Sequence, residues 1–198
     1  MNRSTFRSTS LKAAVLALSV SLSGCAANYT TGNTSSILFV IVAVNGGAPL
    51  RSDVVTNGAV IADSAPVVVA VRFKNLNIPT TPSVPNAIII ERYEVKYRRS
   101  DGRGVEGQDV PFTISGNVTL AVDVTKDENS TLAIDVVRAQ AKLEAPLRNL
   151  RGAVSGTLGG ALAVTMFADI TLHARTISGQ PVSANGSLQI DFADFGDN

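Results

Sequence analysis

The chain has little of the chemistry on which many enzymes and metalloproteins depend. Its 198 residues include one cysteine, one histidine and no tryptophan, and aromatic residues make up only 5%. A lone cysteine has no partner for an internal disulfide, and zinc sites need several Cys or His ligands. No apolar run reaches the ~20 residues of a membrane-spanning helix. We therefore expect no disulfide framework, no conventional metal centre and no cofactor apart from a covalent lipid, as argued below.

An excess of charge of one sign is also missing. Lys and Arg together number 17, Asp and Glu 16, and the formal net charge is +1. A nucleic-acid-binding protein normally carries a basic surface, so no nucleic-acid partner is expected.

The first residues have the three parts of a secretory signal peptide. Arg3, Arg7 and Lys12 precede a short apolar run, 13–22, and no acidic residue occurs among them. A basic start, a short apolar centre and small residues before a cut site are typical of such signals. Removal of three positive residues would take the formal charge from +1 to about −2.

The cut site is more specific. Leu22-Ser23-Gly24-Cys25 resembles the lipobox of bacterial lipoproteins at all four positions. The resemblance implies a signal peptide over 1–24, cleavage before Cys25, and fatty acyl chains on that residue. It also implies sorting to the outer membrane, since Ala26 and not aspartate follows the cysteine. The protein would then be anchored in the cell envelope, either facing the periplasm or exposed at the surface.

The mature chain divides into a tether and one domain. Residues 25–36 are small and polar without apolar periodicity, which is typical of a flexible linker, and fully extended they would reach ~35 Å. The remaining 37–198 has a length that fits a single domain.

This domain has the pattern of an all-β fold. Short runs rich in Val, Ile and Thr are separated by Gly, Asn, Asp and Pro. In 162–174 apolar residues occupy every second position, which predicts one long strand with a buried face. That face holds Leu162, Val164, Met166, Ala168, Ile170, Leu172 and Ala174. The other expected strands lie in 37–44, 67–73, 88–97, 118–124, 132–136 and 188–192.

About seven to nine strands with one buried face each favour an antiparallel two-sheet β-sandwich over an up-and-down barrel. We expect 118–124 and 132–136 to form an antiparallel hairpin, and Ser178–Pro181 to join the last two strands. A short helical turn is allowed only in Leu143–Gly152. From Ile88 to Phe192 the strand lengths and spacing resemble immunoglobulin-like and fibronectin type III-like domains, although the cysteine pair and tryptophan of antibody domains are absent.

The candidate catalytic and metal-binding residues can also be explained without a functional role. His173, the only possible imidazole base, falls on the polar face of the long strand, and no G-x-S-x-G motif accompanies it. Acidic residues gather in two places that could bind calcium, act as a glycosidase-like pair, or only keep loops soluble. These residues are Asp123, Asp127, Glu128 and Asp135, and Asp191, Asp194 and Asp197.

The loop 98–109 is the most distinctive segment. Arg98, Arg99 and Arg103 could bind carboxylate or phosphate groups bidentately, and loops on rigid scaffolds often carry binding residues. Alternatively, the acids of the same loop pair with these arginines. Gly102 and Gly104 do not make a phosphate-binding loop, because no Lys-Ser/Thr follows.

Together these features predict a lipid-anchored, non-enzymatic binding or structural module with an envelope protein or a polysaccharide as its partner. Two other hypotheses remain open. One is an accessory lipoprotein of an outer-membrane assembly or secretion complex, and the other is a glycan or peptidoglycan hydrolase.

Overall fold

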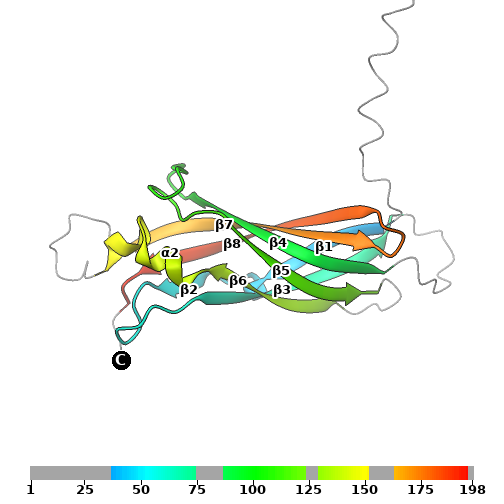
Figure 1. The fold of residues 1–198 in the computed structure, drawn as a ribbon, viewed down its shortest axis with the longest axis horizontal. Coiled ribbons are helices and arrows are strands. Elements are labelled where there is room, and N and C mark those ends of the chain that lie inside the picture. Colours follow the sequence, from blue (N-terminus) through cyan, green and yellow to red (C-terminus); the bar gives the residue numbers. More distant parts are fainter. Residues whose placement is uncertain (1–36, 75–86, 124–128, 152–162, 196–198) are drawn as a thin grey trace, which may run out of the picture. The chain divides into compact units, whose positions relative to one another are not determined.

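A computed structural model describes residues 37–74, 87–123, 129–151 and 163–195. The predicted signal peptide and tether lie outside these residues, so both stay predictions. Within them the chain is all-β, with eight strands and three short helical segments (Figure 1). The strands are β1 Ile37–Val44, β2 Leu50–Asp53, β3 Asp63–Phe73, β4 Ile88–Arg99, β5 Ile114–Val122, β6 Ser130–Val137, β7 Ala163–Thr176 and β8 Pro181–Ala193. The helical segments are η1 Asn45–Gly47, α2 Ala139–Leu143 and η3 Leu147–Leu150.

The strands form two sheets that pack on each other. Sheet A has the order β1-β3-β6, and sheet B has the order β2-β8-β7-β4-β5. All neighbours are antiparallel except β2, which runs parallel to β8. The predicted all-β, two-sheet architecture is therefore confirmed, but the expectation of wholly antiparallel sheets is wrong at the four-residue strand β2, which the sequence pattern did not reveal.

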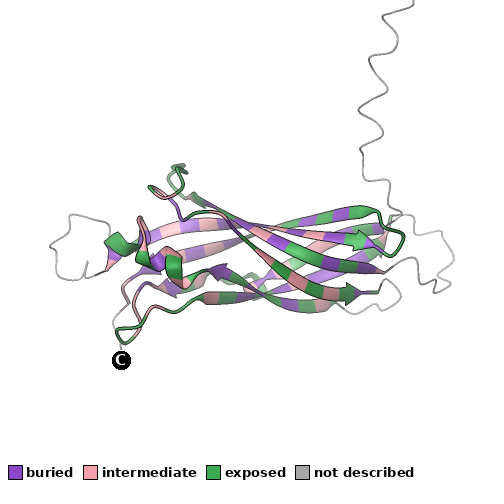
Figure 2. Cartoon of the chain, in the orientation of Figure 1, coloured by how far each residue is buried: buried purple, intermediate pink, exposed green. Residues whose placement is uncertain are grey.

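The period-2 pattern of the longest predicted strand is confirmed. From Val164 to Ala174 in β7 every second residue is buried, and those between are at least partly exposed (Figure 2). Residues of both sheets contribute to one core, in which Phe192 of β8 and Ile90 of β4 are fully buried. Burial of these aliphatic faces between the sheets is the main source of stability.

The predicted hairpin between the fifth and sixth strands is wrong. β5 pairs with β4 in sheet B, whereas β6 pairs with β3 in sheet A. The connection between them therefore passes from one sheet to the other. Half-buried strands show the same alternation whether they pair with each other or face each other across a core, so the pattern alone does not distinguish these cases.

The last two strands are joined where the sequence predicts, and they pair as an antiparallel hairpin whose second strand already begins at Pro181. Pairing runs without interruption from Ala163 opposite Ala193 to Arg175 opposite Pro181. At the turn the Gly179 N–H donates to the Thr176 carbonyl oxygen at 2.8 Å, and Gly179 has φ +85°, which favours glycine.

The predicted helical turn is only partly correct. Helix α2 begins at Ala139, before the expected start at Leu143, and η3 lies inside the predicted range. The segment η1 was not expected. Helices this short have too few turns to show a recognisable period in the sequence.

One close approach in sheet B yields a stability prediction. Gly116 lies opposite Tyr93 in the β4–β5 register, and a Cβ atom at Gly116 would overlap the buried Tyr93 ring. Gly116→Ala is therefore expected to lower the free energy of unfolding by about 1–3 kcal/mol, as overpacking usually does. Urea denaturation would measure this loss. Gly104→Ala is the matched control, because no atom lies within 4 Å of the place that its methyl group would take; an equal loss in both variants would contradict the packing argument.

Candidate functional site

The arginines of the predicted binding loop do not converge on one point. Arg98 lies on β4, where its Nε contacts Asp169 Oδ2 at 2.9 Å and its guanidinium stacks 4.4 Å from the Phe167 ring centre. Arg99 and Arg103 instead meet at Asp101, at 2.8 and 3.5 Å. The structure thus brings together two of the three predicted residues and places Arg98 on the outer face of sheet B.

Pairing within the loop is reflected in the acidity of Asp101. Desolvation alone would raise the pKa of this carboxyl, but hydrogen bonds from the Arg103 backbone and the Arg99 side chain outweigh it and hold the pKa below its ordinary value. The other two loop acids accept hydrogen bonds from the loop itself. Glu106 accepts from the Thr113 backbone N–H and hydroxyl, and Asp109 accepts from the Val105 N–H at 3.3 Å. These bonds fix the loop shape.

The ordered loop displays apolar side chains. Val105 is 57% exposed and Phe112 is 56% exposed. The Phe112 ring lies directly over Gly107, whose φ is +74° and whose absent side chain leaves room for the ring. Large apolar groups held in water by a fixed loop often mark contact sites for a partner.

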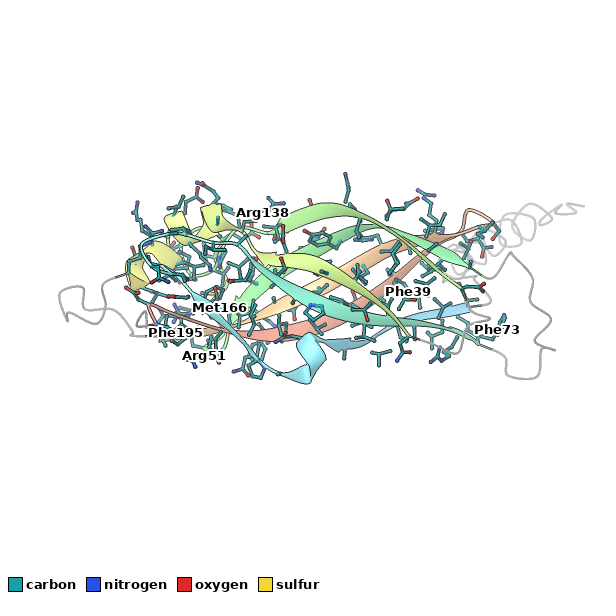
Figure 3. All side chains as sticks on the ribbon, turned by 90° about the horizontal axis from the view of Figure 1, so that it is seen from below. Phe39, Arg51, Phe73, Arg138, Met166 and Phe195 are labelled. Atoms are coloured by element: carbon teal, nitrogen blue, oxygen red, sulfur yellow. The ribbon has the colours of Figure 1, made fainter. Side chains whose placement is uncertain are left out.

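A small pocket opens beside Phe112. Its volume is about 120 Å³, and it lies between 111–114 on one side and helix α2 with its flanks on the other. Apolar walls come from Pro111, Phe112, Ile114, Ala141 and Ala145, and polar groups from Thr113, Arg138, Gln140 and Glu144. The Arg138 Nη2 donates to the Ser115 carbonyl oxygen at 2.6 Å, which ties the start of α2 to β5. Figure 3 shows Arg138 at this end, with Phe39 and Phe73 toward the other.

Helix α2 has an unexpected orientation. Its only buried residue is Lys142, at 1% exposure, while the adjacent Leu143 is 43% exposed. A short surface helix normally turns its leucine inward and its lysine outward. Here the reverse arrangement places Leu143 in solvent at the end of the fold that also carries the pocket.

Specific partners for the buried ammonium explain this orientation. Lys142 Nζ contacts Asp63 Oδ2 at 2.9 Å and donates to the Asp53 carbonyl oxygen at 2.7 Å. The hydroxyl of the fully buried Ser52 donates to the same Asp63 oxygen at 2.5 Å. Because Asp63 begins β3 in sheet A and Asp53 ends β2 in sheet B, one lysine joins both sheets to α2. No motif in the sequence marks this cluster, so it could not be predicted from the sequence.

The β2 end is fastened to the last described residues as well. Asp53 Oδ1 accepts from the Phe195 N–H at 3.1 Å, and its Oδ2 accepts from the Thr56 hydroxyl at 3.1 Å. The Arg51 guanidinium lies over the Phe195 ring, 4.3 Å from its centre. Figure 3 labels the two residues next to each other.

A buried hydrogen bond from Tyr97 joins the two sheets, and its contribution to stability can be tested. The buried hydroxyl donates to the Val136 carbonyl oxygen at 2.7 Å, and burial raises the pKa of Tyr97 above its ordinary value. An unfolded tyrosine ionises near pH 10 while the folded one stays protonated. The raised pKa therefore favours the fold below about pH 10, and this contribution is lost as pH rises further.

Tyr97→Phe is accordingly expected to lower the free energy of unfolding by about 1 kcal/mol at neutral pH, since the Val136 carbonyl loses its partner. The variant should also lose less stability than the wild type between neutral pH and about pH 11. Urea denaturation at both pH values measures this. Parallel losses in the two proteins would show that Tyr97 does not titrate as argued.

The candidate catalytic and metal-binding residues are dispersed. His173 lies on the outer face of β7, opposite Arg92 and Ser183, and its Nε2 has no hydrogen-bond partner among the described residues. Asp135 accepts from the Ser64 hydroxyl, and Asp191 accepts from the Thr165 hydroxyl, each at 2.7 Å. Within the described part of the chain, no three His, Cys, Asp or Glu side chains lie close enough to hold a metal ion.

The calcium hypothesis is not tested by this finding. Asp127, Glu128 and Asp197 belong to the predicted acidic groups but lie outside the described residues. Asp123 and Asp194 lie within the described residues, where no such metal-binding group occurs.

Comparisons with known proteins identify no relative by sequence. No family model matches the chain, and no curated protein does. A solved structure described as Northeast Structural Genomics Consortium target SoR45 is 10% identical, with 78% of this chain and 85% of that chain covered and a TM-score of 0.35. A likeness at this level supports no conclusion about fold or function. In the described segments no helix is long and apolar enough to cross a membrane.

Proposed function

We propose that the protein is a lipid-anchored envelope lipoprotein whose domain is a non-enzymatic binding module for another envelope protein. The observation that carries the proposal is the inverted burial in α2, where Lys142 is inside and Leu143 outside. Keeping a lysine out of water costs free energy unless it is paired, so the fold uses a specific ion pair to hold an apolar side chain in solvent.

The surroundings of Leu143 favour a protein partner over a polysaccharide. Phe112 and Val105 are displayed at the same end of the fold, and the pocket between 111–114 and α2 can receive one apolar side chain. Protein interfaces are centred on aromatic and aliphatic anchors with arginine enriched among them. Arg138 and the Arg99–Arg103 pair supply the charged surroundings.

The proposed lipid anchor rests on the resemblance of residues 22–25 to a lipobox. The tether after Cys25 leads to Ile37 at the start of β1. By the strand register Ile37 and Phe73 lie at one end of sheet A, and the end of β6, from which α2 continues, lies at the other. The proposed contact end is therefore opposite the end that leads to the anchor. A place in an outer-membrane assembly or secretion complex is one form of this proposal. An immunoglobulin-like arrangement of the sandwich is also part of it.

Site-specific photo-crosslinking in intact cells tests the binding surface. A photoreactive residue at position 112 or 143 is expected to give adducts of one discrete mass, whereas the same residue at Lys96, on the outer face of sheet B, should give none. Phe112→Ala should abolish the adduct formed from position 143. Leaving Lys142 and Asp63 untouched keeps the fold intact in these variants.

Two results would contradict the proposal. One is the absence of adducts at 112 and 143, or equal adducts at Lys96. The other is turnover of envelope glycans by the purified protein that disappears in His173→Ala.

A further inference from the structure

The outer faces of the two sheets differ strongly in polarity. The outward side chains on β4 and β7 of sheet B include seven charged residues, many of them in ion pairs. These are Glu91, Arg92, Glu94, Lys96, Arg98, Asp169 and Arg175. The outward side chains in the middle of sheet A are uncharged. They are Leu38, Val40, Pro66, Val68, Thr131 and Ala133, together with the bulged Val42 and with Ala70, which is only 1% exposed.

The most exposed part of this apolar face lies on β1. The whole strand is apolar, Leu38 is 45% exposed and Val42 is 52% exposed. The β1–β3 register shifts between Ile41 and Ala43, so that Val42 is an extra, bulged residue. A bulge redirects side chains, and here it leaves Val42 in solvent. A sheet face of this kind in water usually has an occupant.

The position of β1 in the chain indicates what covers this apolar face. β1 is the first strand after the tether, and only 26–36 separate it from Cys25. Eleven residues reach at most ~35–40 Å, so an acylated Cys25 would keep β1 close to the lipid headgroups at all times. The charged face of sheet B is the outer face of the opposite sheet, and it would point away from the bilayer.

We infer that the outer face of sheet A, centred on Leu38 and Val42, rests on the surface of the bilayer that holds Cys25. This inference depends on the proposed lipid anchor. The anchor supplies the affinity, and the apolar face sets the orientation of the domain, so that the end with Phe112 and Leu143 projects along the membrane surface.

Fluorescence quenching by lipid tests the inference. The full acylated protein is reconstituted into vesicles of phosphatidylethanolamine and phosphatidylglycerol, with or without a lipid that carries a nitroxide near its headgroup. Because Cys25 is the only cysteine and its sulfur would be held in a thioether to the lipid, a fluorophore can be attached at Val42→Cys alone. The control is Lys96→Cys, where the side chain is 68% exposed on the other sheet.

We expect the nitroxide lipid to quench most of the fluorescence at position 42 and little at position 96. Leu38→Glu should restore the fluorescence at position 42 without altering thermal unfolding. Equal quenching at 42 and 96, or none at either, would overturn the inference, as would energy transfer between labels at position 42 in place of quenching. If the protein does not enter vesicles because Cys25 carries no lipid, as its mass would show, the anchor itself fails; acylated protein with an unquenched position 42 contradicts only the orientation.

Discussion

Lys142→Met is expected to lower the free energy of unfolding by about 3 kcal/mol, the largest loss among the single substitutions considered for the folded domain. Breaking a buried ion pair leaves the other charge without compensation, which typically costs about 3–5 kcal/mol. The lower end applies because the Asp63 side chain keeps 21% exposure and the Ser52 hydroxyl still donates to it. Methionine matches the length of lysine, so the loss reports on the charge and not on a cavity. Urea denaturation provides the measurement.

A double-mutant cycle with Asp63→Asn separates pairing from packing. If the ion pair carries the effect, the double variant should lose clearly less than the sum of the two single losses. Lys96→Met is the matched control, since that lysine pairs with Glu94 at the surface, where such pairs contribute little. Additive losses, or a Lys142→Met protein as stable as the control, would mean that the pair does not hold the two sheets and α2 together.

The same substitution should act on the proposed binding surface. When methionine replaces Lys142, the inward position of α2 no longer requires a charged partner, and Leu143 is free to compete for it. Crosslinking from position 143 should then fall even under conditions in which the domain stays folded. In this way the buried cluster would position Leu143 for the proposed contact.

The strands could be predicted from the sequence because burial in this domain is one-sided and regular. The face of β7 from Val164 to Ala174 repeats every two residues, and a strand is the only element that fits this period. Pairing between strands could not be predicted in the same way. The connection after β5 leads to the other sheet, and neither the length of a loop nor the alternation beside it specifies that crossing.

The candidate site was only partly accessible to sequence reasoning. The glycines and arginines of 98–109 predict a binding loop or, alternatively, a loop whose acids pair with its arginines. The structure shows such pairing at Asp101, which contacts Arg99 and Arg103. The proposed binding surface depends instead on Phe112 and Leu143, which no pattern in the sequence singles out. The exposed position of Leu143 is explained by Lys142 reaching Asp63 across 79 positions of the chain, a contact that no local pattern encodes.

Removal of Cys25 is expected to release the protein from the membrane completely. In the proposed lipoprotein, wild-type chain should incorporate labelled fatty acid and stay in the membrane pellet after an alkaline carbonate wash. Each buried CH₂ contributes ~0.8 kcal/mol, so two or more acyl chains hold a protein permanently. A chain that begins at Ala26, exported behind an ordinary cleavable signal peptide, should instead appear in the soluble fraction without label. Ser21→Ala, next to the lipobox but outside it, is the control and should behave like the wild type.

The soluble chain also separates the anchor from the apolar face of sheet A. Exposed aliphatic side chains such as Leu38 and Val42 bury only a few methyl groups each in a headgroup layer, far less than acyl chains do. They can orient a tethered domain but should not retain an untethered one. Wild-type protein that washes off with carbonate and carries no fatty acid would contradict the lipid anchor. Retention of the Cys25-less chain on the membrane would instead assign to sheet A the attachment that we assign to the lipid.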